Sequence, residues 1–186
     1  LQGENSHGAE YIASAIEHGC VVVLIEGKYF ECDVLTIRID NLKTHLSKLA
    51  QNLYTKAKNV APIAVTGTNG KTSVSDYISQ LLDFLAVDNG VIGTLGISKV
   101  DKKSVNTTPD IFSIHSSLEE YWNQGIKLAI IETSSHALIQ DRLEGLSFIH
   151  GIFTNLTQDH LDYHETMDNY REAKVKLFKN DFSKKA

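Results

Sequence analysis

The sequence has 186 residues, of which 42% are hydrophobic and 22% are charged, and its formal net charge is −5. This composition is typical of a globular protein of one or one and a half domains, and the negative charge argues against nucleic acid or an anionic membrane as the main partner. The longest apolar run, residues 20–25, is too short to span a bilayer, and no signal-peptide pattern opens the chain, so we expect a cytoplasmic protein without membrane insertion.

The first part of the chain predicts a small α/β unit. Residues 11–17 have apolar side chains at helical spacing and are followed by His18-Gly19, a typical helix stop. Residues 21–25 predict a buried strand, and residues 36–39 predict a second short strand. Residues 42–57 carry leucines at spacings of four, three and four, which indicates an amphipathic helix leading to the next unit.

After Pro62 the pattern changes to alternating strands and helices. We expect strands at residues 63–65, 91–92, 128–131 and 148–153. We expect helices after residue 72, at residues 111–122 and at residues 166–178, the first with one apolar stripe from Val74 to Leu85. Strands that are apolar on both faces and alternate with helices favour a mainly parallel sheet covered by helices, which binds ligands at the carboxyl ends of its strands.

A glycine-rich loop with a lysine lies between the first of these strands and the following helix. Its residues are Gly67, Thr68, Asn69, Gly70, Lys71, Thr72 and Ser73. Glycines let backbone N–H groups approach phosphate oxygens, while a lysine and a hydroxyl can reach the phosphates and Mg²⁺. The loop is shorter than the usual phosphate loop, and Val65 stands where that loop has a glycine. A glycine-rich turn with a chance lysine is the alternative.

Two further polar residues follow apolar strands. Glu132 comes directly after residues 128–131, and His160 lies in a loop rich in histidine and aspartate after Phe153. If both strands neighbour the strand before the loop, the three motifs converge, and a carboxylate and an imidazole beside phosphates are reasonable Mg²⁺ ligands. Taken singly, Glu132 could equally be a cap or an ion-pair partner, and His160 a hydrogen-bonded structural histidine.

Four strings together resemble the Mur ligase family, and most closely its members that add the third residue of the peptidoglycan stem peptide. They are the glycine-rich loop, Asn-Thr-Thr at residues 106–108, residues 132–138, which contain Ser-Ser-His-Ala-Leu, and the stretch from Phe-Thr-Asn-Leu at residues 153–156 through Asp-His-Leu-Asp-Tyr-His at residues 159–164. The resemblance implies that residues 1–40 are the C-terminal part of a UDP-substrate-binding N-terminal domain. It implies that residues 41–186 are the first part of a central ATP-binding domain with a Mur-type phosphate loop. We therefore expect a truncated fragment without the C-terminal domain, inactive by itself.

The same resemblance implies roles for individual residues. The loop from Gly67 to Ser73 would hold ATP, while Thr72, Glu132 and His160 would surround Mg²⁺. The residues expected to contact a UDP-N-acetylmuramoyl-dipeptide are Asn106, Thr107, Thr108, Ser134, Gln140 and Arg142. The guanidinium of Arg142 suits a carboxylate or phosphate, although a surface ion pair with a neighbouring acid is the alternative.

Lys71, His160 and Lys174 are the implied catalytic residues, with Lys174 carbamylated. Lys174 lies four residues after Tyr170 and three before Leu177, on the inward face of the last expected helix. The ordinary explanation of such a lysine is that its stem packs at the edge of the apolar stripe while its ammonium reaches water. The alternative is an uncharged inward amine that adds CO₂ and offers an anionic oxygen to Mg²⁺.

The implied function is an ATP-dependent, Mg²⁺-requiring ligase. It would phosphorylate the D-glutamate carboxylate of UDP-N-acetylmuramoyl-L-Ala-D-Glu and let the amine of an amino acid displace phosphate, with both L-lysine and meso-diaminopimelate open as the added residue. A folate-polyglutamate-type ligase shares the fold and loop, but we do not expect it to carry the Asp-His-Leu-Asp-Tyr-His string. A P-loop phosphotransferase or a nucleotide-binding module would need no muramoyl contacts.

Overall fold

The computed structural model describes residue 1 and residues 7–27, 32–100 and 106–179. Its chain forms two compact units, Leu1–Leu49 and Ala50–Ala186. The division falls inside helix α2 (Leu42–Leu53), whereas the family resemblance implies a boundary between residues 40 and 41. The assignment of the first unit to a UDP-substrate-binding domain stays a prediction. No helix among these residues combines the length and the apolar character needed to cross a bilayer.

The first unit contains a 3₁₀ turn η1 (Gly8–Tyr11), helix α1 (Ile12–Glu17) and the parallel strands β1 (Val22–Ile25) and β2 (Leu35–Arg38). The expected strand at residues 21–25 forms over Val22–Ile25, but the expectation that it is buried is wrong. Only Ile25 is buried there, while Val21 is 74% exposed. The physical reason is that a two-stranded sheet has too little area to cover both faces of either strand.

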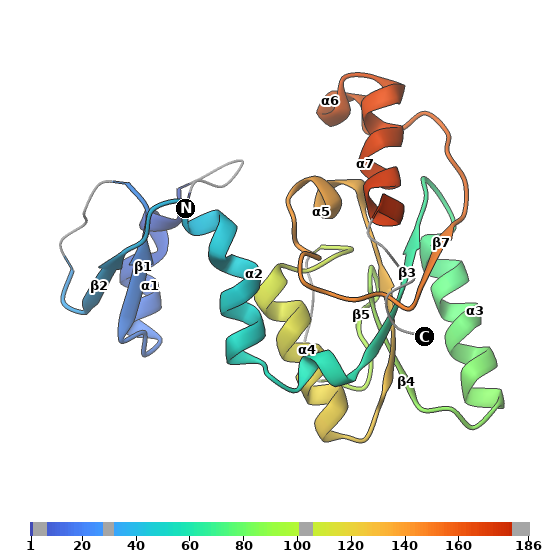
Figure 1. The fold of residues 1–186 in the computed structure, drawn as a ribbon, viewed down its shortest axis with the longest axis horizontal. Coiled ribbons are helices and arrows are strands. Elements are labelled where there is room, and N and C mark those ends of the chain that lie inside the picture. Colours follow the sequence, from blue (N-terminus) through green and yellow to red (C-terminus); the bar gives the residue numbers. More distant parts are fainter. Residues whose placement is uncertain (2–6, 28–31, 101–105, 180–186) are drawn as a thin grey trace. The chain divides into compact units, whose positions relative to one another are not determined.

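The second unit is built on a five-stranded sheet with the order β5-β4-β6-β3-β7 (Figure 1). Its strands are β3 (Ala61–Thr66), β4 (Asn89–Gly93), β5 (Gly96–Ile97), β6 (Leu128–Glu132) and β7 (His150–Phe153). All pairs are parallel except β4 with β5, so the prediction of a mainly parallel sheet is confirmed. Because β3 lies between β6 and β7, the segments that follow these three strands start at adjacent points of one edge.

Helices cover both faces of this sheet. Helix α3 (Lys71–Phe84) and helix α4 (Ile111–Asn123) lie on opposite sides of it in Figure 1. The α4 side holds the main core, in which Ile114 and Leu118 pack in one cluster with Ile131 of β6. Since side chains alternate along a strand, Glu132 points to the other face, on which α3 packs.

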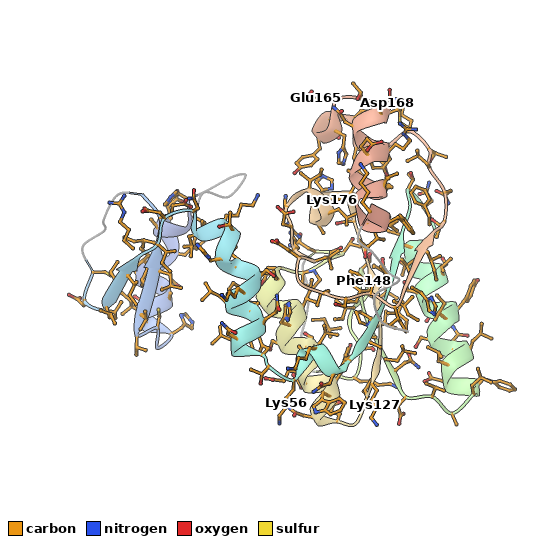
Figure 2. All side chains as sticks on the ribbon, in the orientation of Figure 1. Lys56, Lys127, Phe148, Glu165, Asp168 and Lys176 are labelled. Carbon is orange, nitrogen blue, oxygen red and sulfur yellow. The ribbon has the colours of Figure 1, made fainter. Side chains whose placement is uncertain are left out.

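Three short or terminal helices lie beyond the carboxyl ends of the strands. They are α5 (Ser135–Ile139), α6 (Leu161–His164) and α7 (Met167–Lys179), and α7 packs against the other two. Figure 2 shows Glu165 and Asp168 at this end, and Lys56 and Lys127 at the opposite edge of the sheet. The expected helix over residues 42–57 is too long, because α2 ends at Leu53 and a separate 3₁₀ turn, η2 (Ala57–Asn59), follows.

The stripe predicted along α3 is only partly buried. Val74, Ile78 and Leu82 are half-buried toward the sheet, as expected from their spacing. Tyr77 and Leu81 are each 63% exposed, which contradicts the expectation of a single core-facing stripe. The apolar residues of α3 extend around more of the helix than one sheet face can cover.

Candidate nucleotide and metal site

The glycine-rich loop has the backbone shape that an anion site requires. Gly67 has φ +145° and Gly70 has φ +81°, conformations that side-chain-bearing residues rarely adopt. A Cβ atom at Gly67 would also lie 1.9 Å from Oγ1 of Thr154, so no side chain fits there. Gly70 caps α3 without any side-chain hydrogen bond, and the first-turn N–H groups of the helix can therefore donate to a bound phosphate.

The segment after β7 holds this loop in place. Thr68 donates its N–H to the carbonyl of Asn155 at 2.9 Å, and its hydroxyl donates to the carbonyl of Thr157 at 3.1 Å. The N–H of Asn69 donates to Oδ1 of Asn155 at 3.0 Å, while Thr154 donates its hydroxyl to the carbonyl of Asn69 at 2.6 Å. Thr154 and Asn155 lie in one of the strings that resemble the Mur ligases, but no role in holding the loop was predicted for them, although polar residues directly after a strand that neighbours β3 were the available signal.

Two lysines converge on the loop. Lys71 donates to the carbonyl oxygens of Gly67 and Thr68, each at 2.9 Å, and Lys174 of α7 donates to the same Gly67 oxygen at 2.9 Å. Lys174 is 1% exposed, so its ammonium does not reach water. Burial, together with the neighbouring charge of Lys71, lowers the pKa of Lys174 to about 8, and the charge of Asp159 acts weakly in the opposite direction. Burial also lowers the pKa of Lys71.

Glu132 places a buried carboxylate beside the loop. It pairs in register with Val65 of β3 and is 1% exposed. Its Oε2 accepts from the hydroxyl of Thr72 at 2.9 Å and from that of Thr94 at 3.0 Å, and its Oε1 accepts from the N–H of Thr94 at 3.2 Å. Gly93 makes room for it, because a Cβ there would lie 2.2 Å from Oε1. These hydrogen-bond donors are all uncharged, so a cation bound beside Glu132 would offset the cost of burying its charge.

The oxygen atoms at this position suit Mg²⁺. The hydroxyl of Thr72 and the carboxylate of Glu132 lie side by side, and Mg²⁺ prefers such ligands together with water and phosphate oxygens. Within residues 7–27, 32–100 and 106–179, no group of three or more His, Cys, Asp or Glu side chains could hold a metal ion. A divalent cation here would therefore complete its coordination with water and nucleotide phosphates.

His160 is the N-cap residue of α6 and has φ +51°. Its Nε2 lies 3.6 Å from Oδ2 of Asp159. The ring also lies edge-on to His136, with 4.9 Å between centroids, and 6.2 Å from the ring of Tyr170. Its side chain is 47% exposed, so an added ligand could reach it. The expected role of His160 as a metal ligand stays a prediction.

A histidine and tyrosine cluster joins the three helices at this edge. His136 of α5 lies 4.1 Å from the ring centroid of Tyr163, and His164 lies 5.0 Å from that of Tyr170. The Nε2 of buried His164 is 2.9 Å from the hydroxyl of Ser135. Burial, followed by the charges of His136 and His160, lowers the pKa of His164. The sequence pattern singled out only His160, because the other contacts depend on how the helices pack.

Most of the expected substrate contacts form one hydrogen-bonded chain that ends at Glu132. The Thr108 hydroxyl donates to the backbone carbonyl of Glu132 at 2.7 Å and accepts from the N–H of Ser134 at 3.0 Å. The guanidinium of Arg142 donates to the carbonyl of Thr108 at 2.7 Å and to the side-chain oxygen of Gln140 at 2.8 Å.

The hydroxyl of Thr107 lies 3.1 Å from the hydroxyl of Thr94. Because the Thr94 hydroxyl also donates to Glu132, Thr107 lies in the same region as these residues. Asn106 is exposed next to Thr107 along the chain. Thr94 is a functional candidate that sequence reasoning missed. It directly follows β4 at the same edge, so the reasoning that selected Glu132 applies to it.

The chain resembles known proteins over most of its length. The Mur ligase middle domain matches residues 65–185. UDP-N-acetylmuramoyl-L-alanyl-D-glutamate--2,6-diaminopimelate ligase from Clostridium tetani is 38% identical over 191 residues, which cover 98% of this chain and 39% of that protein. The enzyme of the same name from Alkaliphilus oremlandii is also 38% identical, over 96% of this chain and 37% of that protein. The chain thus spans about two fifths of the length of these curated relatives.

Solved structures agree with the fold. A structure of a UDP-N-acetylmuramoyl-L-alanyl-D-glutamate--2,6-diaminopimelate ligase superposes with a TM-score of 0.74 at 31% identity, over 91% of this chain and 35% of that one. A MurF ligase from Thermotoga maritima in complex with ADP superposes with a TM-score of 0.61 at 19% identity, over 99% of this chain and 39% of that one. The second likeness shows the shared fold alone.

Proposed function

The chain belongs to the Mur ligase middle-domain family, and we propose that the protein containing it is an ATP-dependent ligase of peptidoglycan precursor synthesis. The proposed substrate is UDP-N-acetylmuramoyl-L-alanyl-D-glutamate, which receives the third residue of the stem peptide. The names of the relatives specify 2,6-diaminopimelate, so we propose diaminopimelate rather than L-lysine as the added amino acid.

One observation supports this proposal most directly. The glycine-rich loop, the buried carboxylate of Glu132 and the chain of hydrogen bonds from Thr108 to Arg142 meet at one edge of the sheet. The groups that we propose to bind phosphate, a cation and a second substrate therefore lie within reach of one another. Phosphoryl transfer depends mainly on such positioning and on neutralisation of charge.

Each group of residues at this edge has a separate proposed role in binding. The N-terminus of α3 and Lys71 would hold the phosphates of ATP, and Lys71 would exchange its two carbonyl acceptors for phosphate oxygens. Thr72 and Glu132 would hold Mg²⁺, with His160 as a further ligand. When bound, ATP supplies the phosphoryl group that activates the D-glutamate carboxylate. Arg142 would orient a carboxylate or phosphate of the muramoyl substrate through its guanidinium.

Lys174 is proposed to act as a carbamate. Its amine nitrogen would form a bond to the carbon of CO₂ and release one proton, which leaves an anionic carbamate. The burial of Lys174 and its pKa of about 8 favour the uncharged amine that this reaction needs. The product would also replace the repulsion between two ammonium groups by an attraction to Lys71.

The test is phosphate release by the complete protein with ATP, Mg²⁺ and UDP-N-acetylmuramoyl-L-alanyl-D-glutamate. We expect release that depends on the muramoyl substrate and on meso-diaminopimelate, with little release when L-lysine replaces it. Release that requires a folate and glutamate would identify a folate-polyglutamate-type ligase. Release that is indifferent to every acceptor would identify a simple nucleotide hydrolase.

A further inference from the structure

Helix α5 ends in a turn that carries two of the expected substrate contacts. Gln140 is the C-cap residue, and Asp141 follows it with φ +60°. Arg142 then donates its N–H back to the carbonyl of Ala137 at 3.0 Å. A left-handed residue followed by a backward hydrogen bond of this kind is a common way for a helix to end. Gln140 and Arg142 flank Asp141, so a group that holds Asp141 also fixes the backbone from which both side chains project.

Lys176 of α7 holds this turn (Figure 2). Its Nζ donates to the carbonyl of Leu138 at 2.8 Å and also to the carboxylate of Asp141. The side chains of Lys176 and Asp141 are 46% and 39% exposed, and an ion pair so exposed to water contributes little to the stability of a fold. Its effect is geometric, because one ammonium bridges the end of α5 and the turn that follows.

Helix α7 is itself fixed to the nucleotide loop. The hydroxyl of Tyr170 donates to Oγ1 of Thr68 at 3.1 Å, and the buried Lys174 donates to the carbonyl of Gly67 at 2.9 Å. Lys176 follows two residues later, which is a rotation of about 200° around the helix, and it reaches α5 on the other side. One helix therefore holds the nucleotide loop with one lysine and the turn after α5 with another.

The turn continues into the proposed substrate contacts. The guanidinium of Arg142 donates to the side chain of Gln140 and to the carbonyl of Thr108, and the Thr108 hydroxyl donates to the carbonyl of Glu132. A guanidinium has five N–H donors, so these two bonds orient it and leave donors for a carboxylate or phosphate. Since the bonds need Gln140 and Arg142 in their present places, a shift of the turn would misalign the guanidinium.

We propose that Lys176 is a positioning residue for the muramoyl substrate, because it holds the turn with Gln140 and Arg142 at a fixed place relative to the nucleotide loop. The inference rests on the proposed function, in which these two side chains contact that substrate. Lys176 acts through them and has no part in the chemical step. Its loss should therefore weaken binding of one substrate, which raises KM at constant kcat.

The experiment is steady-state phosphate release by the complete protein with ATP, Mg²⁺, UDP-N-acetylmuramoyl-L-alanyl-D-glutamate and meso-diaminopimelate. Lys176→Met removes the ammonium and keeps a long side chain. It should raise KM for the muramoyl substrate about fivefold or more, with kcat and KM for ATP within about twofold of the wild type. Lys176→Arg can donate to both oxygens and should recover most of the affinity. Circular dichroism checks that each variant is folded.

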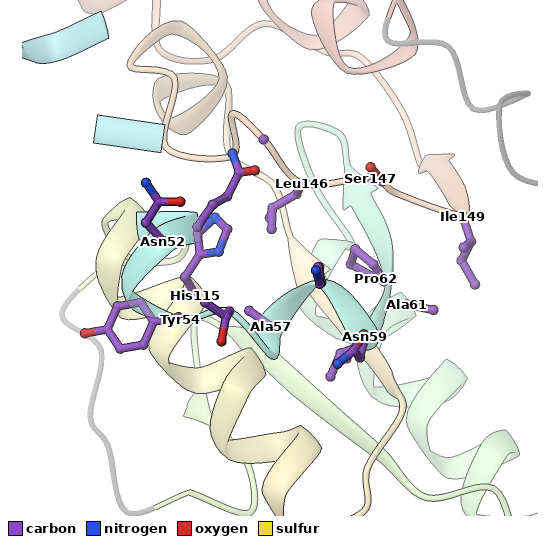
Figure 3. A pocket seen from close by; sticks show the side chains of 15 residues that line it. Asn52, Tyr54, Ala57, Asn59, Ala61, Pro62, His115, Leu146, Ser147 and Ile149 are labelled. Atoms are coloured by element: carbon purple, nitrogen blue, oxygen red, sulfur yellow. The ribbon is translucent and has the colours of Figure 1, made fainter. Parts of the chain in front are cut away.

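Two matched controls remove an exposed lysine elsewhere. Lys179→Met acts on the same helix, where Lys179 pairs with Glu172. Lys58→Met acts beside a cavity of about 380 Å³ at the start of β3 (Figure 3). Both controls should keep the wild-type KM values.

Two results would overturn the inference. One is a KM of Lys176→Met for the muramoyl substrate that equals that of the controls. The other is an equal rise in KM for ATP and for the muramoyl substrate, which would show a general loosening of the domain. A wild-type protein whose phosphate release does not depend on the muramoyl substrate would instead refute the proposed function, and the inference with it.

Discussion

The ammonium groups of Lys71 and Lys174 share one acceptor, the carbonyl oxygen of Gly67, each across 2.9 Å. Two cations on one carbonyl repel each other, and the charge of Lys71 contributes to the low pKa of Lys174. A bound phosphate would relieve this repulsion by drawing Lys71 away, and a carbamate would relieve it by reversing the charge of Lys174. The pair therefore couples phosphate binding at the glycine-rich loop to the charge of Lys174 on α7.

Replacement of Lys71 tests the nucleotide site. Lys71→Ala in the complete protein should weaken ATP binding by at least about tenfold, because it removes a charge-assisted contact to phosphate. Calorimetric titration with ATP measures this, and circular dichroism checks the fold. Lys127→Ala is the matched control, since Lys127 precedes β6 at the opposite edge (Figure 2). Equal affinity in the two folded variants would be incompatible with the assigned role.

Labelled CO₂ tests the carbamate. With ¹³C-bicarbonate the complete protein should show a carbamate carbon signal. At a fixed concentration of dissolved CO₂ this signal should grow as the pH rises toward 8, because only the uncharged amine reacts. The signal should vanish in Lys174→Met and persist in Lys176→Met, whose residue lies exposed on the same helix. Lys174→Ala should lower ligase activity, and a short carboxylic acid should partly restore it. Full ligase activity of Lys174→Ala at saturating Mg²⁺ would rule out the carbamate role.

The buried ammonium of Lys174 should also affect stability. Its pKa is about 8 in the folded protein and 10.5 for a lysine side chain in water, so the unfolded chain binds more protons between these values. The free energy of unfolding should therefore rise with pH from about 8 to 10.5 in the absence of CO₂, and the penalty for the buried charge should be complete below pH 8. Urea unfolding of the unmodified chain and of Lys174→Met measures the difference. A parallel pH dependence in both proteins would show that Lys174 titrates normally.

Glu132→Gln should remove the cation preference of the site while keeping its shape. The amide has the size of the carboxylate, and the hydroxyls of Thr72 and Thr94 can each donate or accept, so the hydrogen bonds can be rebuilt. We expect the gain in nucleotide affinity that Mg²⁺ produces to be smaller by about tenfold or more. The melting temperature should change little. Titrations with ADP at several Mg²⁺ concentrations measure this. Retention of the full Mg²⁺ dependence would place the cation elsewhere.

Thr94 is expected to position Glu132. Thr94→Val keeps the backbone N–H that donates to Glu132 but removes the hydroxyl that donates to Oε2. The change should cost about 1 kcal/mol of stability and weaken nucleotide binding in the presence of Mg²⁺ severalfold. Thr94→Ser, which restores the hydroxyl, should recover the affinity. Loss of stability in Thr94→Val without any loss of Mg²⁺-dependent affinity would indicate a purely structural residue.

The parts of this structure that sequence predicts are those fixed by local pattern. Runs such as residues 128–131 are apolar on both faces, which predicts a buried parallel strand and so places Glu132 at its carboxyl end. Strand β5 has two residues and carries no periodic signal, so the turn that brings Thr94 to Glu132 was not predicted.

Other features depend on what packs against an element. The contacts of His136 and His164 require the relative placement of α5, α6 and α7, which no local pattern encodes. The exposure of Tyr77 and Val21 likewise depends on the area available to cover them, and apolar spacing alone gives no measure of that area.

The pairing of Val65 with Glu132 and of Val65 with Ile152 makes the site sensitive to single-residue changes in strand length. A strand has a period of two, so one residue inserted within β6 would turn the carboxylate from the α3 face to the α4 face, into the apolar core. The same insertion in the turn before β6, near Gly125, would leave the alternation of the strand unchanged. Length variation in this domain should thus be tolerated where strands begin and be damaging within them, even where every side chain that touches a ligand is kept.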